Sequence, residues 1–249
     1  MSLPRRTPSQ VAAMRRAGRV VAEMHDRMRA AAIPGVTTQA LDAIGREVLA
    51  ERGARSNFLG YHGFPGVACI SVNEEVVHGI PRDRVLVEGD VVSIDCGAIV
   101  DGWHGDAAIT VGIGTVDQAA QHLIEVTRQA LDDAVAACVV GNRIGAIGAA
   151  VESIARREKF GLVREYTGHG IGRAMHEAPD IPNYGPPNRG AKLAVGNTIC
   201  IEPMLTEGSG QVNELEDGWT VVCREGGRSA HWEHTVLVGE DGPEVLTAP

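Results

Sequence analysis

Two carboxylates stand close together on a segment that the sequence predicts to be a β-hairpin. Apolar and small residues alternate around Asp101-Gly102, a dipeptide that favours a two-residue type I′ turn because both central residues of that turn have positive φ. Counting from the turn places Asp95 opposite Ala108, with Asp106 as its diagonal neighbour on one face, about 7–8 Å away. Carboxylates this close among Val and Ile repel each other and are costly to bury unless cations lie between them. For this segment alone, an exposed polar face is an equal alternative.

The second half of the chain repeats the arrangement. Five positions match at a constant spacing of 107 residues, namely Leu86, Gly89, Asp90, Ile94 and Asp95 with Leu193, Gly196, Asn197, Ile201 and Glu202. The run 104–107 matches 231–234 at a spacing of 127, so the second copy has 20 additional residues between its acidic strands. Chance matching of short segments is the weaker alternative, and we interpret the chain as two related halves. Four carboxylates would then converge about a pseudo-twofold axis: Asp95, Asp106, Glu202 and Glu233.

Histidines near these carboxylates complete a candidate catalytic set. His169 lies between two glycines, which leave its imidazole accessible to a metal, although a single histidine is more often structural. Structural zinc sites favour thiolate ligands, whereas a site with four carboxylates and one imidazole suits Mn, Fe, Co, Mg or Zn. Four carboxylates are too many for one ion and fit two ions. Paired ions about 3.5–4 Å apart activate water as a nucleophile. His78 and His176 would then act as non-ligands that hydrogen-bond a scissile amide and help to protonate the leaving amine.

Composition excludes several classes of protein. The 249 residues carry a net charge of −9, which argues against DNA or another nucleic acid as the main partner. No run reaches the roughly 20 apolar residues of a membrane span, and the basic start of the chain lacks the apolar core of a signal peptide. The 5 cysteines are scattered without a CxxC pair, which is typical of reduced thiols. We therefore expect a cytoplasmic protein.

The pattern predicts the elements that position these residues. We expect a flexible tail over 1–6 and then one domain over 7–249, with pseudo-halves at about 7–112 and 118–239. Thr7, Pro8 and Gln10 are typical of a helix start. Further predicted helices cover about 38–52, 117–139 and 143–159, and predicted strands cover 67–72, 198–202 and 231–238, with an irregular segment over 179–190.

Three aromatic residues lie within seven positions in a glycine-rich stretch. Phe58, Tyr61 and Phe64 precede the strand predicted at 67–72, and the glycines around them indicate a loop. Such a loop could form the wall of an apolar pocket. A hydrophobic plug over the preceding pair of helices is an equal alternative.

Several motifs together resemble the type I methionine aminopeptidases over nearly the whole chain. They are Tyr61-His62-Gly63-Phe64-Pro65, Asn73-Glu74-Glu75-Val76-Val77-His78-Gly79-Ile80-Pro81, Ile94-Asp95, Gly105-Asp106, Gly168-His169-Gly170-Ile171-Gly172, Ile201-Glu202-Pro203-Met204 and Glu233-His234-Thr235. The resemblance implies the "pita-bread" α/β (α+β) fold, a curved antiparallel sheet shared by two halves of helix pair and strands, in its minimal bacterial form. It implies removal of the initiator methionine from nascent proteins when the next residue is small.

The resemblance also implies roles for individual residues. Asp95 would bind one divalent ion, His169 and Glu202 would bind a second, and Asp106 and Glu233 would bridge them, with Co, Mn, Fe, Zn or Ni as the metal. The residues that would line the methionine pocket are Phe58, Tyr61, Phe64, Cys69, His78, Met175, His176 and Trp219. Met175 is a departure, because bacterial relatives usually have Phe there. A monovalent Na or K site would involve Asn73, Glu75 and Ser229.

The resemblance implies N-terminal peptides of nascent proteins as partners, transient contact with the ribosome, and a monomer. Two rival functions are weighed against it. Aminopeptidases and prolidases that cleave Xaa-Pro bonds usually carry a large additional N-terminal domain, for which we see no room. A binding module of this fold without catalytic activity would lack metal ligands, whereas this chain has all five.

Overall fold

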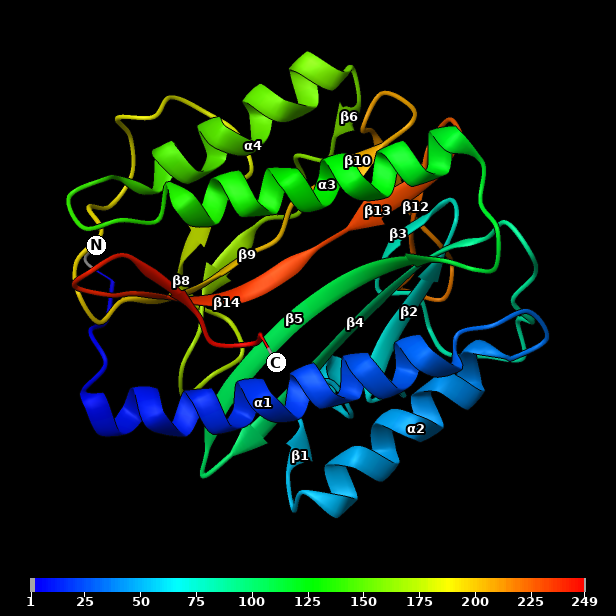
Figure 1. The fold of residues 1–249 in the computed structure, drawn as a ribbon, viewed down its shortest axis with the longest axis horizontal. Coiled ribbons are helices and arrows are strands. Elements are labelled where there is room, and N and C mark those ends of the chain that lie inside the picture. The colour runs from blue at the N-terminus through cyan, green and yellow to red at the C-terminus, as the bar shows by residue number, and fades with distance from the viewer. Residues whose placement is uncertain (1–2, 249) are drawn as a thin grey trace.

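The computed structural model describes residues 3–248, which form four helices around one large curved sheet (Figure 1). The helices are α1 (Pro8–Ala31), α2 (Thr38–Glu51), α3 (Gln118–Ala136) and α4 (Ile144–Glu158), with a short 3-10 turn at Tyr61–Gly63. The strands of the first half are β1 (Arg55–Ser56), β2 (Ala68–Val72), β3 (Glu75–Val77), β4 (Val91–Val100) and β5 (Trp103–Gly112). Those of the second half are β6 (Gly161–Leu162), β7 (Gly168–Gly170), β8 (Glu177–Ile181), β9 (Thr198–Ile201), β10 (Met204–Thr206), β11 (Val212–Glu214), β12 (Val221–Cys223), β13 (Ser229–His231), β14 (Glu233–Val238) and β15 (Pro243–Val245).

The main sheet has nine strands and joins the two halves of the chain. Its order is β1-β4-β5-β14-β9-β7-β8, with β2 also paired to β4 and β15 to β14. The halves meet where β5 pairs antiparallel with β14. Two three-stranded sheets, β13-β10-β6 and β11-β12-β3, complete the fold. This is the curved antiparallel sheet and helix arrangement expected from the sequence.

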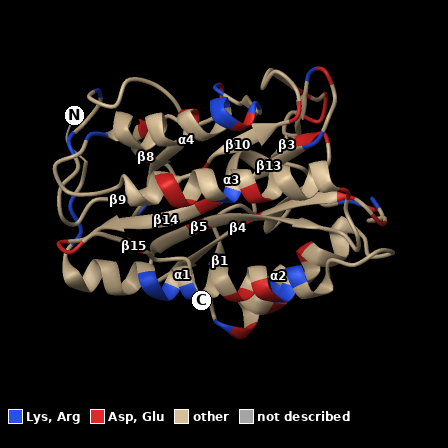
Figure 2. Cartoon of the chain, turned by 45° about the horizontal axis from the view of Figure 1, so that its top comes forward, with Lys and Arg blue, Asp and Glu red and all other residues tan. Residues whose placement is uncertain are grey.

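Each half has its own apolar core between a helix pair and the sheet. In the first half, Met24 and Leu41 from α1 and α2 pack with Ile94 of β4. In the second half, Leu131 and Ile147 from α3 and α4 pack with neighbouring strands. Acidic and basic residues both occur along the helices (Figure 2), and some form ion pairs, as Arg27 does with Glu51. Among residues 3–248, no helix has the length and apolar character needed to cross a membrane.

The local predictions for the first half are confirmed. The side chain of Thr7 accepts from the backbone amide of Gln10, and the side chain of Gln10 accepts from the amide of Thr7, which is a capping box at the start of α1. Asp101 and Gly102 have φ values of 52° and 74°, as a type I′ turn requires. The register therefore follows by counting, and Asp95 pairs with Ala108 as predicted.

Three local expectations differ from the structure. Residues 179–181, which were expected to be irregular, belong to β8. Residues 3–6 do not behave as a loose tail: Leu3 is 5% exposed within the core of the second half, and the side-chain amide of Asn197 donates to the carbonyl of Pro4. Residues 1 and 2 lie outside the described residues. The strand predicted at 231–238 is broken at Trp232, because β13 pairs with β10 in a small sheet whereas β14 pairs with β5 and β9 in the main sheet.

Candidate functional site

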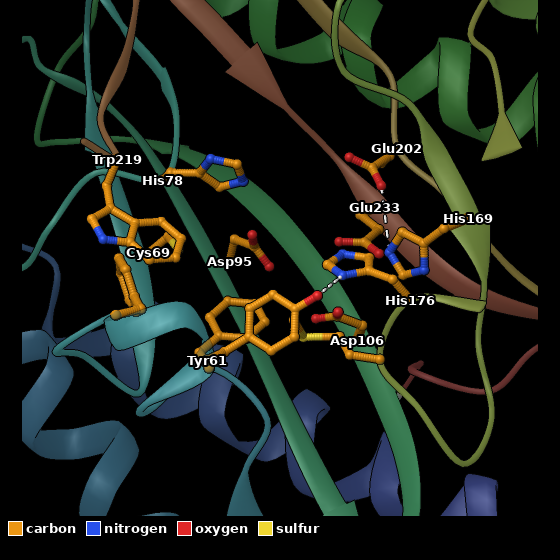
Figure 3. Close-up of a pocket in the computed structure, with 13 residues that line it drawn as sticks. Tyr61, Cys69, His78, Asp95, Asp106, His169, His176, Glu202, Trp219 and Glu233 are labelled. Carbon is orange, nitrogen blue, oxygen red and sulfur yellow. Dashed lines mark hydrogen bonds and ion pairs between the residues drawn. The ribbon is translucent and has the colours of Figure 1, made fainter. Parts of the chain in front are cut away.

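The four carboxylates meet because their strands are neighbours in the sheet. Asp95 on β4 pairs with Ala108 on β5, and Ala108 pairs on its other side with Glu233 on β14. Asp106 lies two residues before Ala108 and therefore projects from the same face. Glu202 directly follows β9, which is the next strand after β14. Figure 3 shows the four carboxylates around one cavity, with Glu202 and Glu233 near His169.

The potential ligand atoms of this group are close together. One ligand atom each from Asp106, His169, Glu233 and Cys200 lie within 4.8 Å of one another. The Nε2 atom of His169 is 3.6 Å from Oε1 of Glu202. Asp95 lines the same cavity. The structure thus brings together all five residues that the sequence predicts as metal ligands.

Burial gives these carboxylates unusual protonation behaviour. Removal from water raises the pKa of Asp95, Asp106 and Glu202 well above the ordinary value, and the nearby charge of Glu233 raises each further. Burial raises the pKa of Glu233 itself to about 7. Full ionisation of four such groups needs compensating positive charge.

The donor set fits divalent cations. Oδ1 of Asp95, Oδ1 of Asp106 and Oε1 of Glu233 are buried without a hydrogen-bond partner. Buried polar oxygens normally have partners, so three in one place indicate a ligand. Several carboxylate oxygens and one imidazole are a typical donor set for ions of the Mn, Fe, Co and Zn type.

His169 is held in one orientation by the backbone. Its Nδ1 donates to the carbonyl of Gly170 at 2.9 Å, which leaves Nε2 free to face the carboxylates. The flanking glycines, which were expected to leave space around the imidazole, also have a packing role. A Cβ at Gly168 would lie 2.3 Å from the carbonyl oxygen of Cys200, and one at Gly170 would lie 2.8 Å from that of Glu177. The glycines therefore permit close strand packing on both sides of β7.

The other two predicted histidines lie in the same cavity and are not part of the carboxylate cluster. His78 has a left-handed backbone with φ of 61°, which is uncommon for a residue other than glycine and is often found at functional sites. Burial lowers the pKa of His78 to about 4. His176 Nδ1 is 2.8 Å from the hydroxyl of Tyr61 (Figure 3). Burial also lowers the pKa of His176, with a smaller contribution from His62.

The predicted pocket residues form one apolar cluster beside the carboxylates. Phe64 packs edge-on against Trp219 with 5.0 Å between ring centroids, and against Phe58 at 6.4 Å. The aromatic loop is thus a pocket wall that Trp219 completes. The cavity encloses about 130 Å³, and its lining contains every residue predicted for metal binding, catalysis and the pocket: Phe58, Tyr61, Phe64, Cys69, His78, Asp95, Asp106, His169, Met175, His176, Glu202, Trp219 and Glu233.

The three residues predicted for a monovalent cation also meet. The hydroxyl of Ser229 donates to the carbonyl oxygens of Asn73 and Glu75, at 3.1 and 3.0 Å. The carboxylate of Glu75 is directed elsewhere, because it pairs with Arg82 and Arg84. Only the backbone oxygen of Glu75 therefore faces Ser229.

Sequence reasoning missed two residues of the site. Cys200 lies among the ligand atoms of the carboxylate cluster, and its Sγ is 3.6 Å from the hydroxyl of Thr235. Thr235 in turn accepts from the amide of Asp106 and donates to its carbonyl, and so joins β14 to β5 under the cluster. Strand alternation was the available signal, because Cys200 is two residues before Glu202 and Thr235 is two after Glu233.

Known proteins share both this sequence and this fold. Residues 12–240 match the model of metallopeptidase family M24. The chain is 50% identical to methionine aminopeptidase 1 of Mycobacterium tuberculosis, over 98% of this chain and 95% of that protein. It is 44% identical to methionine aminopeptidase 1 of Bacillus subtilis, over 97% of this chain and 98% of that protein.

Some solved structures match this chain in both sequence and fold, and others in fold alone. The crystal structure of methionine aminopeptidase from Thermotoga maritima matches with a TM-score of 0.98 and 41% identity, covering 99% of this chain and 100% of that one. The prolidase from Pyrococcus furiosus matches with a TM-score of 0.80, but with 21% identity and over only 65% of its length, so that likeness concerns the fold alone. The chain therefore belongs to metallopeptidase family M24 and, within it, to the methionine aminopeptidases.

Proposed function

We propose that this protein removes the N-terminal methionine from peptides and nascent proteins whose second residue is small. The observation that carries the proposal is one cavity in which buried carboxylates without partners adjoin an apolar aromatic pocket. The pocket accepts an unbranched apolar side chain, and the carboxylate end receives the adjoining peptide bond.

Five side chains would hold two divalent ions, with Co, Mn, Fe, Zn or Ni as candidates: Asp95, Asp106, His169, Glu202 and Glu233. Bound there, the ions supply Lewis-acid activation of water and of the scissile carbonyl. Support comes from the raised pKa values of the carboxylates, because cations would replace the protons that these groups otherwise retain. Calorimetric titration of metal-free protein with Mn²⁺ or Co²⁺ should yield two ions per chain, and saturation at one ion would contradict this part of the proposal.

His78 and His176 would act on the substrate directly. Both are neutral near pH 7, because burial keeps their pKa values below the ordinary one. A neutral imidazole has one donor and one acceptor nitrogen, so it can donate to the developing oxyanion or pass a proton to the leaving amine. The contact of Tyr61 with Nδ1 of His176 leaves Nε2 of that ring for the substrate.

The remaining pocket residues would select the first side chain. Phe58, Phe64, Cys69 and Trp219 enclose apolar volume, and Met175 adds a flexible thioether that adapts its shape to the ligand. Together with Tyr61, these residues favour a methionine side chain over a charged or a β-branched one.

A peptide panel tests the activity. Protein loaded with Mn²⁺ or Co²⁺ should release methionine from Met-Ala-Ser, release it far more slowly from Met-Leu-Ser, and leave dipeptides such as Ala-Pro intact. Cleavage of Xaa-Pro dipeptides without release from Met-Ala-Ser would overturn the proposal in favour of a prolidase-like activity.

We also propose a cytoplasmic monomer that meets its substrates by transient contact with the ribosome and that holds a Na or K ion at Asn73, Glu75 and Ser229. The five cysteines are free and buried, which suits a reducing compartment. The convergence of the Asn73 and Glu75 carbonyls on the Ser229 hydroxyl supports the monovalent site. Thermal melting in KCl, NaCl and tetramethylammonium chloride at equal ionic strength tests it, and equal melting temperatures would contradict it.

A further inference from the structure

The residues before α1 are attached to the loop that carries Met175 and His176. We propose that Arg6 and Glu177 are positioning residues, and that segment 3–6 acts as a strap that holds His176 in place for the reaction. This inference rests on the proposed function, because it assumes that His176 acts on the substrate.

Arg6 is fixed by contacts at both its backbone and its side chain. Its amide donates to the carbonyl of Gly196 at 2.7 Å. The guanidinium forms an ion pair with Glu177, and it donates to the carbonyl of Ile171 at 3.1 Å and to the hydroxyl of Thr198 at 3.2 Å. The side chain is only 10% exposed. A planar guanidinium with several donors in fixed directions holds three acceptors at once, which a flexible ammonium does less well.

Glu177 connects Arg6 to the loop through its two carboxylate oxygens. Oε2 faces Arg6, whereas Oε1 accepts from the amides of Arg173 and Ala174, at 2.8 and 3.3 Å. The carboxylate therefore closes the backbone over residues 173–177, and His176 is the residue directly before it. A displacement of Glu177 would move His176 with it.

The hairpin tip of the first half holds the loop from the other side. The carbonyl of Gly172 accepts from the amide of His104 at 2.9 Å, and a Cβ at Gly172 would lie 2.2 Å from the Arg6 guanidinium. Arg6 and Arg173 both lie over the ring of Trp103, at 5.5 and 4.6 Å from its centroid. The loop is thus clamped between the strap and the hairpin.

Within the cavity, His176 has few other restraints. Tyr61 contacts its Nδ1, and its ring centroid is 4.3 Å from that of His169 (Figure 3). These contacts fix the rotation of the ring, but the position of its Cα depends on the loop. A misplacement of about 1 Å can reduce a rate by roughly 100-fold, because the reacting groups must be aligned. The strap therefore influences catalysis through the position of His176, without touching the substrate.

A second ion pair provides a matched control. Arg15 near the start of α1 pairs with Glu244 on β15, again joining an early arginine to a glutamate far along the chain. Both of its side chains are about 40% exposed, at 41% and 42%, and neither lines the cavity. Arg15→Met thus removes an arginine–glutamate pair without affecting the loop at 171–177.

The first experiment measures the strap without using activity. Amide hydrogen exchange is followed by mass spectrometry in the wild type, Arg6→Met, Glu177→Gln and Arg15→Met. Exchange in peptides that cover 171–177 should rise by roughly tenfold or more in Arg6→Met and stay at the wild-type rate in Arg15→Met. Unchanged exchange in Arg6→Met overturns the strap, whatever the protein hydrolyses. If Arg6→Met does not fold, Glu177→Gln replaces it in the test. That variant keeps a side-chain oxygen for the amides of residues 173 and 174 and removes only the charge that pairs with Arg6.

The second experiment asks whether the strap acts through His176. With Met-Ala-Ser as substrate, Arg6→Met should lower kcat by roughly 10- to 100-fold. In a His176→Ala background, the same change should alter kcat by less than about twofold, because its target is already absent. An equal loss in both backgrounds would show a general structural role and overturn the inference. If the wild type released no methionine from any peptide, the proposed function would fail, while the exchange experiment would still decide the strap.

Discussion

The two halves of the molecule share a backbone framework in which equivalent side chains have changed. In the first half the amide of Gly35 donates to the carbonyl of Leu86 at 2.8 Å, and in the second half Gly141 donates to Leu193 at 3.1 Å. The repeat in the sequence aligns Leu86 with Leu193, and Gly35 and Gly141 lie at equivalent places, each three residues before the second helix of its half, α2 or α4. Corresponding hydrogen bonds at corresponding places show that the repeat is structural, so any difference between the halves is informative.

The acidic strands show the largest difference. In the first half a two-residue turn joins β4 directly to β5, and both proposed ligands are Asp. In the second half residues 203–232 separate Glu202 from Glu233, and this segment carries Trp219 into the pocket. Both halves thus provide carboxylates and pocket residues, but those of the first half lie on a tight hairpin, whereas the second half has longer carboxylates and an intervening segment that adds Trp219 to the pocket wall.

The largest effect is expected from removing one carboxylate charge in either half. Asp106→Asn and Glu233→Gln should each lower the rate of Met-Ala-Ser hydrolysis by more than roughly 100-fold. Loss of a residue that only hydrogen-bonds a metal ligand costs up to about that much, and loss of a ligand should cost more. Circular dichroism should show that both variants remain folded, because the substitutions keep shape and remove a buried charge. Near-normal activity in either variant would contradict equivalent roles for the two halves.

The loops before the acidic strands differ in one pair of aligned residues, Asp90 and Asn197. Asp90 accepts from the side-chain amide of Asn73 and from the amide of Val87. The side-chain oxygen of Asn197 likewise accepts from a backbone amide, that of Ala194. Its side-chain NH₂ group, however, donates to the carbonyls of residues 3 and 4. A carboxylate cannot donate, so Asp90 could not bind the carbonyls of residues 3 and 4 as Asn197 does.

Exchanging these residues should therefore have unequal effects. Asn197→Asp places a buried charge against two carbonyl oxygens and should lower the free energy of unfolding by roughly 3 kcal/mol. Asp90→Asn retains an acceptor and should cost about 1 kcal/mol. Urea denaturation of both variants measures the difference, and equal losses would show that the donor role of Asn197 is unimportant.

The first helix of each half has a different buried residue at the equivalent position, ten residues before Gly35 or Gly141. This residue is His25 in α1 and Leu131 in α3. Both are buried. Burial lowers the pKa of His25 to about 3, with a smaller contribution from nearby His234. Its Nε2 has no hydrogen-bond partner. The first half thus contains a buried titratable group where the second half has a hydrocarbon.

His25→Leu, which copies the second half, should make the protein less sensitive to acid. Because the pKa of His25 is lower in the folded state, the unfolded state binds the proton first, and stability is lost as the pH falls from about 6.5 towards 3. Between pH 7 and pH 5, the wild type should lose about 2 kcal/mol more than the variant. Urea denaturation at both pH values provides the test, and parallel losses would exclude His25 as the source.

The sequence by itself determined the features that depend on neighbours along the chain. Asp101-Gly102 fixes the turn and hence the register of Asp95, because only certain residues accept its positive φ values. The cap at Thr7 is equally local. The repeat then predicted that acidic residues of both halves occupy equivalent strands. Each of these signals lies within a few residues or in a direct match of two segments.

Tertiary structure decided the features that depend on contacts between distant segments. Nothing near Arg6 indicates that its partner is Glu177, and nothing near Trp232 indicates that the strand changes sheets there. The contact between Tyr61 and His176 likewise joins a loop of the first half to one of the second. Such pairs form only after the two halves close on each other, because burial and the exclusion of water, rather than local backbone preference, make them favourable.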